Sequence, residues 1–257
     1  MTELKPTVKR IGLTVEPALT ESERSDFSVY VRMQLKQYGL SNYEYREDDK
    51  EHFFNNGPII STEDEVYVKI TAGATVDVAA GQNLGPEILV KILCSIWSWK
   101  DRQLVTNSRV GAYDYQMLFE IPFKGNHYEV LRDAFYNPDT IGRFYDTVMQ
   151  QLPGTRIRDN DVYILISLPA NRVLALRITG QSTRREIDLQ DYKERPIKIS
   201  FGILQERVVA LTVPLEDAIA GHITMACNLC DATLKTHVIP RVEEMVRQYK
   251  DKVSPRS

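Results

Sequence analysis

The most restrictive feature of the sequence is a series of strand-like segments that follow one another too closely for helical crossovers. In the second half of the chain these segments are Val162–Leu168, Arg172–Thr179, Ile197–Leu204 and Val208–Val213. The connections Pro169-Ala170-Asn171 and Gln205-Glu206-Arg207 are short enough to be hairpin turns. Parallel neighbours need a crossover of about a dozen or more residues, whereas antiparallel neighbours need only a tight turn. This half is therefore predicted to be an antiparallel meander.

The first half mixes strands with helices. Ile11, Leu13 and Val15 alternate as in a strand with one buried face, and Thr20 with Glu23 forms a capping box for a helix. The segments 65–72 and 75–79 read as a hairpin, and residues 109–123 as a long strand. Between them, Gly85-Pro86 opens an almost entirely apolar helix, which is expected to be buried.

The chain is predicted to end in a long helical unit. It follows Pro214, extends to about Lys250 and is divided or kinked at Pro240. Its apolar stripe includes Ile219 and Leu234 and is expected to pack on the chain's own sheet, unless part of it remains exposed as a dimer surface. The predicted class is thus α+β, with a mixed strand/helix N-terminal half followed by an antiparallel β-meander packed against a long C-terminal helical unit. The polar segment 152–160 suggests a boundary between lobes 1–153 and 154–257, although one continuous domain fits as well.

Composition indicates a globular protein of a reducing compartment. Apolar residues make up 43% and charged residues 26% of the chain, and the net charge is −3, unlike the basic balance of a dedicated nucleic-acid binder. Residues 1–10 lack the apolar core of a signal peptide. The longest apolar stretch is interrupted by Lys91, so no membrane association is expected. Three cysteines do not suggest a disulfide scaffold, and a cytoplasmic location is expected.

The spacing of Cys227-Asn228-Leu229-Cys230 resembles redox and zinc sites, but its context does not fit them. The pair lies deep inside a predicted helix, far from the helix N-terminus that would stabilise a thiolate. His237 is seven residues beyond Cys230, about 10 Å along a helix axis and too far to share one zinc. We therefore interpret both residues as core cysteines and predict no metal and no cofactor. His127 lies in a capping context and is expected at the surface.

Arginines supply the weak candidates for contact with phosphate groups or nucleic acid. They are Arg156, Arg158, Arg184 and Arg185. Together they would form a positive rim if the ends of the meander face the same way. Glu186 and Asp188 follow directly and would cancel much of that field.

Aromatic residues in a charged context supply the weak candidates for contact with a partner protein. They are Tyr43, Tyr45, Phe53 and Phe54. Aromatic side chains are enriched in protein interfaces. The run between them, Arg46–His52, is predicted to be a solvated loop or a frayed helix.

The leading hypothesis is a non-catalytic protein–protein interaction or assembly protein that associates with another protein or with copies of itself. The first alternative is a phosphate-handling or metal-dependent hydrolase, which would combine the arginine rim with acids such as Glu63, Asp64 or Asp188. The second is a weak nucleic-acid-binding protein that uses the same arginines. No catalytic residue can be named from the sequence, and the expectation leans away from an enzyme.

Overall fold

The structure is a computed structural model that describes residues 4–16, 20–37, 45–47, 51–54, 63–71, 75–98, 109–136, 147, 150, 161–208 and 211–253. The elements of the first half are β1 (Val8–Glu16), α1 (Glu21–Gln37), β2 (Tyr45–Glu47), β3 (Glu51–Phe54), β4 (Val66–Thr71), β5 (Thr75–Gly81) and α2 (Pro86–Trp97). Those that follow are β6 (Arg109–Lys124), α4 (His127–Phe135), β7 (Val162–Leu168), β8 (Arg172–Thr179), α6 (Arg184–Leu189), β9 (Glu194–Gln205), α7 (Leu215–Leu229), the π-helix η2 (Cys230–Val238) and α8 (Ile239–Val253).

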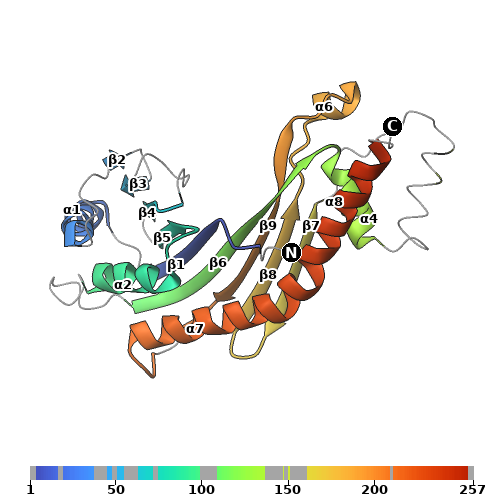
Figure 1. Ribbon diagram of the computed structural model, residues 1–257. Helices are drawn as coiled ribbons and strands as arrows, with labels where there is room; N and C mark the ends of the chain where they lie inside the picture. The colour runs from blue at the N-terminus through green and yellow to red at the C-terminus, as the bar shows by residue number, and fades with distance from the viewer. Residues whose placement is uncertain are drawn as a thin grey trace.

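The described strands form one nine-stranded sheet in the order β2-β3-β4-β5-β1-β6-β9-β8-β7. All neighbouring strands in it are antiparallel. Helices α2, α7 and α8 lie along one face, and α6 projects beyond the ends of β8 and β9 (Figure 1). The protein therefore has the predicted α+β architecture, with a meander of β7, β8 and β9 and a long C-terminal helical unit.

The two halves of the sheet are connected in the same order. In the first half, β1 lies at the centre, the last strand β5 pairs with it, and β4 and β3 continue outward. In the second half, β6 lies at the centre, the last strand β9 pairs with it, and β8 and β7 continue outward. The halves meet where β1 pairs with β6. They differ at the outer edges, because β2 lies outside β3 whereas no described strand lies outside β7.

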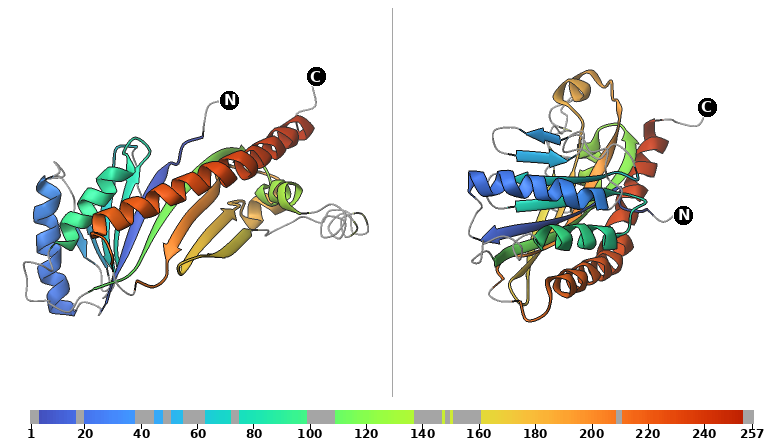
Figure 2. Two further views of the ribbon diagram at one scale, coloured as in Figure 1. Left: turned by 90° about the horizontal axis from the view of Figure 1, so that it is seen from below. Right: turned by 90° about the vertical axis from the view of Figure 1, so that its left-hand side faces the viewer.

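The long strand β6 shows how side chains divide between the two faces. Its odd-numbered residues from Tyr113 to Phe123 are buried, whereas the even-numbered ones from Ala112 to Lys124 are partly or fully exposed. The buried face joins a single apolar cluster that includes residues of α1, α2, α4, α7 and α8. The long helical unit crosses this face from α2 toward α4 (Figure 2). We call the other side of the sheet the open face.

Helix caps form where the sequence predicts them. The backbone N–H and hydroxyl of Thr20 donate to the carboxylate of Glu23, and the N–H of Glu23 donates back to the Thr20 hydroxyl oxygen. At α4, the side chain of Asn126 accepts from the N–H of Tyr128. Within the described ranges, no helix is both long and apolar enough to span a membrane.

The C-terminal helical unit continues through Pro240. Its apolar stripe packs inside the protein, and Ile219 and Leu234 are among its buried residues. In a regular α-helix, a proline ring clashes with the carbonyl group four residues earlier. Directly before Pro240, η2 widens the helix, and the N–H of Ile239 donates to the carbonyl of Leu234 five residues back. This wider turn accommodates the proline without dividing the helix.

Two local predictions are wrong. Val208 and Leu211–Val213 do not form a fourth meander strand. Both edges of β9 are already occupied, by β6 and β8, and the side chain of Gln205 binds the turn carbonyls of Ala170 and Arg207. The predicted loop or frayed helix over Arg46–His52 instead contributes the ends of β2 and β3. Pairing with the edge of β4 overrides the local sequence preference there.

The predicted lobe boundary near residue 153 lies outside the described residues. The sheet itself is continuous across the two halves, because β6 pairs with β9 over residues 113–124 and 194–205. The division into lobes 1–153 and 154–257 stays a prediction.

Candidate functional site

The outer strand β7 carries four successive apolar residues with exposed side chains. Tyr163 is 64% exposed, Ile164 42%, Leu165 56% and Ile166 48%. We call these four residues the β7 edge. Strand β7 is the last strand of the sheet, and no described residue pairs with its outer side. Among the described residues, the outer backbone groups of β7 have no strand partner, and they lie beside these apolar side chains.

The β7 edge is apolar on both faces of the sheet. Ile164 and Ile166 lie opposite Leu176 and Leu174, which are buried on the helix-covered face. Leu165 lies opposite Ala175, and Tyr163 opposite Arg177, on the open face. Side chains of one strand alternate between faces, so that any polypeptide paired with β7 would meet apolar groups on both sides.

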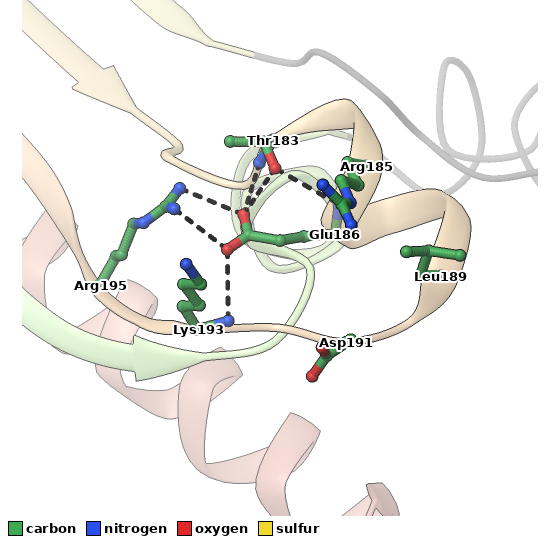
Figure 3. A pocket seen from close by; sticks show the side chains of 7 residues that line it. All are labelled: Thr183, Arg185, Glu186, Leu189, Asp191, Lys193 and Arg195. Carbon is green, nitrogen blue, oxygen red and sulfur yellow. Dashed lines mark hydrogen bonds and ion pairs between the residues drawn. The ribbon is translucent and has the colours of Figure 1, made fainter.

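A second feature is a pocket of about 290 Å³ between α6 and the start of β9, which we call the α6 pocket (Figure 3). It is lined by Thr183, Arg185, Glu186, Leu189, Asp191, Lys193 and Arg195. Thr183 caps α6 in a capping box, in which its hydroxyl oxygen accepts from the N–H of Glu186 and its own N–H donates to the Glu186 carboxylate. This cap fixes the first turn of α6 above the pocket.

Glu186 and Arg195 largely neutralise each other in this pocket. Their charged groups approach at 3.1 Å in two places, and Arg195 also donates to the carbonyl of Gln181 at 2.6 Å. The backbone N–H of Thr183, with smaller contributions from its hydroxyl and from Arg195, holds the pKa of Glu186 below its usual value. Arg185, Lys193 and Asp191 are exposed, and the two cations exceed the single carboxylate by one positive charge.

Two of the four predicted arginines lie within the described residues. Arg184 and Arg185 form the first turn of α6, and Arg185 lines the α6 pocket. Arg156 and Arg158 lie outside the described residues. Lys193 and Arg195 were not predicted, and their sequence signal is the run of charged residues from Asp191 to Arg195.

The predicted aromatic residues lie at the opposite edge of the sheet from β7. Tyr45 is on β2 and pairs with Phe54 of β3, the strand that also contains Phe53. Tyr43 lies outside the described residues. The sheet order thus separates the predicted aromatic residues from the β7 edge and from the α6 pocket.

An ion cluster occupies the open face at the centre of the sheet. The Arg10 guanidinium lies 3.1 Å from Asp77 and 3.4 Å from Asp114. Burial raises the pKa of Asp114, and the nearby Arg10 opposes that rise. One oxygen of Asp114, Oδ2, is buried and has no hydrogen-bond partner among the described residues. The cluster joins β1, β5 and β6.

Buried His127 corrects the prediction of a surface histidine. The residue is 1% exposed because α4 packs its N-terminus against the loop before α6. Its Nδ1 lies 2.5 Å from the Ser182 hydroxyl oxygen, and its Nε2 lies 3.1 Å from the carbonyl of Arg195. Ser182 also donates to the carbonyl of Gly125. Although serine and histidine are neighbours, both are buried and both bind backbone groups, which favours a clamp between loops over a nucleophile.

The cysteines of the CxxC pair lie within the helical unit. Cys230 is buried and Cys227 half-buried, and both are free thiols, as is Cys94. Burial raises the pKa of Cys230 to about 12 and that of Cys94 to about 11. Thiols with such values stay protonated at neutral pH and are poor nucleophiles.

The sequence matches no model of a known protein family and no curated protein.

Proposed function

We propose that this protein is a non-catalytic assembly protein that binds another polypeptide as an added strand along β7. The observation that carries the proposal is the β7 edge, four consecutive exposed apolar residues on the outermost strand of the sheet. Strand addition supplies affinity through main-chain hydrogen bonds and specificity through alternate side chains. The β7 edge has both components in one segment.

The sequence of β7 supports this role. Native proteins protect an outer strand with lysines, prolines, bulges or a covering segment, because unprotected edges pair with other chains. The segment Val162–Leu168 contains no charged residue, no proline and no glycine. Its regular register with β8 is uninterrupted over all seven residues. Such an edge is suited to be covered by a partner.

The free thiols support a reducing location for this assembly. Cys94, Cys227 and Cys230 are free thiols, and cysteines of cytoplasmic proteins are usually reduced. We therefore place the proposed association in the cytoplasm.

A labelled strand peptide tests the proposal directly. The probe is a fluorescein-labelled peptide with the sequence of residues 161–169, flanked by lysines for solubility. We expect its polarisation to rise on titration with the full chain, and binding to be lost in the double variant Tyr163→Lys with Leu165→Lys, because edge lysines oppose strand pairing.

The matched control is Val29→Lys with Met33→Lys on α1. Val29 is 56% and Met33 60% exposed, close to the values at Tyr163 and Leu165, but these residues lie on a helix. The control should bind the peptide as the wild type does. A peptide that does not bind the chain at concentrations where the chain is monomeric, or that binds the β7 double variant equally well, excludes strand addition at β7. Circular dichroism of each variant verifies its fold.

The α6 pocket favours a second candidate function, the binding of a phosphate-bearing ligand. In this pocket Glu186 neutralises Arg195, and of the other charged lining residues Arg185 and Lys193 are positive and Asp191 is negative, which leaves a net positive charge. Titration with inorganic phosphate, and separately with a mixed-sequence oligonucleotide, should then show binding that weakens with salt and falls in Arg185→Ala with Lys193→Ala. Equal behaviour of that variant and the wild type would remove this candidate.

A further inference from the structure

The two halves of the sheet indicate that a position beyond β7 is suited to one more strand. From the centre outward, the strands of the first half follow the order β1, β5, β4 and β3, and those of the second half follow the order β6, β9, β8 and β7. In each half the strand that comes first in the chain thus pairs with the one that comes last. In the first half, β2 lies outside the fourth strand, β3, and pairs with it over Tyr45–Glu47. The equivalent position outside β7 holds no described strand.

We propose that a second copy of this chain occupies that position, with the two β7 strands antiparallel about a two-fold axis at Leu165. This inference rests on the proposed strand addition at β7 and names its partner. Homodimers most often form such two-fold interfaces, in which one surface pairs with itself. Such an interface requires a surface that is complementary to the same surface of the second copy.

The β7 edge meets this requirement in the proposed register. Leu165 lies opposite the partner's Leu165, and Ile164 lies opposite the partner's Ile166. These cross-strand pairs are apolar on both faces, and directly opposed apolar pairs stabilise antiparallel sheets. Tyr163 lies opposite the partner's Ser167, and Val162 opposite the partner's Leu168. Because the strand carries no charge, no like charges meet along it.

The nearest charged side chains are Arg177 and Arg172 of β8, which lie opposite Tyr163 and Leu168, and Asp161 directly before β7. Asp161 precedes β7, and its carboxylate lies 3.9 Å from Arg177. In the proposed register, Asp161 is level with the partner's Pro169 at the hairpin turn, and not with another carboxylate. The paired segment of seven residues spans about 24 Å, at roughly 3.4 Å per residue, and joins the two sheets into one.

Sedimentation velocity tests whether the partner is a second copy of this chain. We expect the full chain to sediment with twice its mass of 29.5 kDa and to dissociate on dilution. Leu165→Lys should shift the chain to the monomer mass, because two lysines would face each other at the two-fold axis. Val29→Lys, at an equally exposed apolar residue, should keep the dimer.

A charge-reversal pair tests the register. Leu165→Lys and Leu165→Glu should each be monomeric alone and should form a mixed dimer when combined, since only a residue on the axis faces its own equivalent. A wild-type chain that stays monomeric at all concentrations overturns the second-copy proposal. If that monomer still binds the strand peptide, strand addition itself survives. A dimer that persists in both single variants overturns both the partner site and the register.

Discussion

Gly12 of β1 lies directly opposite Asp114 of β6 at the centre of the sheet, and its other cross-strand neighbour is Asp77 of β5. A side chain at Gly12 would collide with the Asp114 carboxylate and would come within 2.8 Å of Asp77 Oδ1. The missing side chain lets both carboxylates lean over Gly12 toward the Arg10 guanidinium. One glycine thus makes room for an ion cluster that links three strands.

Gly12→Ala is expected to destabilise the protein by about 1–3 kcal/mol, the usual penalty of overpacking. The added methyl group would displace both carboxylates from Arg10. The measurement is the free energy of unfolding in urea. Gly221→Ala is the matched control, because nothing lies within 4 Å of a methyl group at that exposed position in α7. The control should gain stability by about 0.5–1 kcal/mol through helix propensity. Equal effects of the two substitutions would contradict this role of Gly12.

The stability of the protein is expected to fall when the pH drops below about 6.5, the ordinary pKa of histidine. His222 is buried, its Nε2 lies 2.8 Å from the carbonyl of Ile203, and its ring packs edge-on against Tyr113. Burial lowers the pKa of His222 and also that of His127. Between the folded and unfolded pKa values the unfolded chain binds more protons, so stability is fully present above the unfolded value and declines as the pH falls.

Substitution isolates the contribution of His222. The unfolding free energies of His222→Asn and of the wild type should become more alike as the pH is lowered from 7 toward 5. Only the wild type loses stability through the lowered pKa of buried His222. The slope that one such group adds is at most about 1.4 kcal/mol per pH unit. His237→Asn, at an exposed residue of η2, is the control. A difference for His222→Asn that stays constant with pH would show that this histidine does not titrate abnormally.

Much of the fold follows from local patterns. The alternation of Ile11, Leu13 and Val15 predicts β1, and the segments Val162–Leu168 and Arg172–Thr179 have the bounds of β7 and β8. Local rules suffice at these places because side-chain alternation and tight turns act between residues that are close in sequence.

Long-range pairing accounts for what the sequence could not supply. The order of the strands places β9 between β6 and β8, which leaves β9 no free edge for the predicted fourth meander strand at Val208–Val213. The same order leaves β7 outermost, although an uninterrupted apolar run is typical of a strand buried on both faces. The α6 pocket likewise depends on the contact of Glu186 with Arg195, nine residues away and across a turn.

Ser182→Ala is expected to lower the unfolding free energy by about 1–3 kcal/mol, the penalty for leaving a buried hydrogen-bonding group unpaired. The Ser182 hydroxyl oxygen accepts from the N–H of His127, and the Ser182 O–H donates to the carbonyl of Gly125. Both backbone groups would lose this partner. Ser22→Ala, at an exposed residue of α1, should change stability by less than about 0.5 kcal/mol. An equally small effect of Ser182→Ala would show that the hydroxyl is not the clamp between these loops.

Thr183→Ala is expected to lower the free energy of local unfolding of α6 by about 1 kcal/mol, the typical contribution of an N-cap side chain. Thr183 holds Glu186 through its N–H and its hydroxyl, and Glu186 in turn holds Arg195. Because α6 has only six residues and projects from the end of the sheet (Figure 1), the effect should be local.

The amide of Ile187 reports on this local unfolding, since its N–H donates to the Thr183 carbonyl at 3.1 Å. Hydrogen exchange at Ile187 should accelerate roughly fivefold for about 1 kcal/mol, while amides of β6 keep their rates. Thr183→Ser retains the hydroxyl and should exchange like the wild type. If Thr183→Ser and Thr183→Ala accelerate exchange equally, the threonine methyl group and not the cap stabilises the α6 pocket.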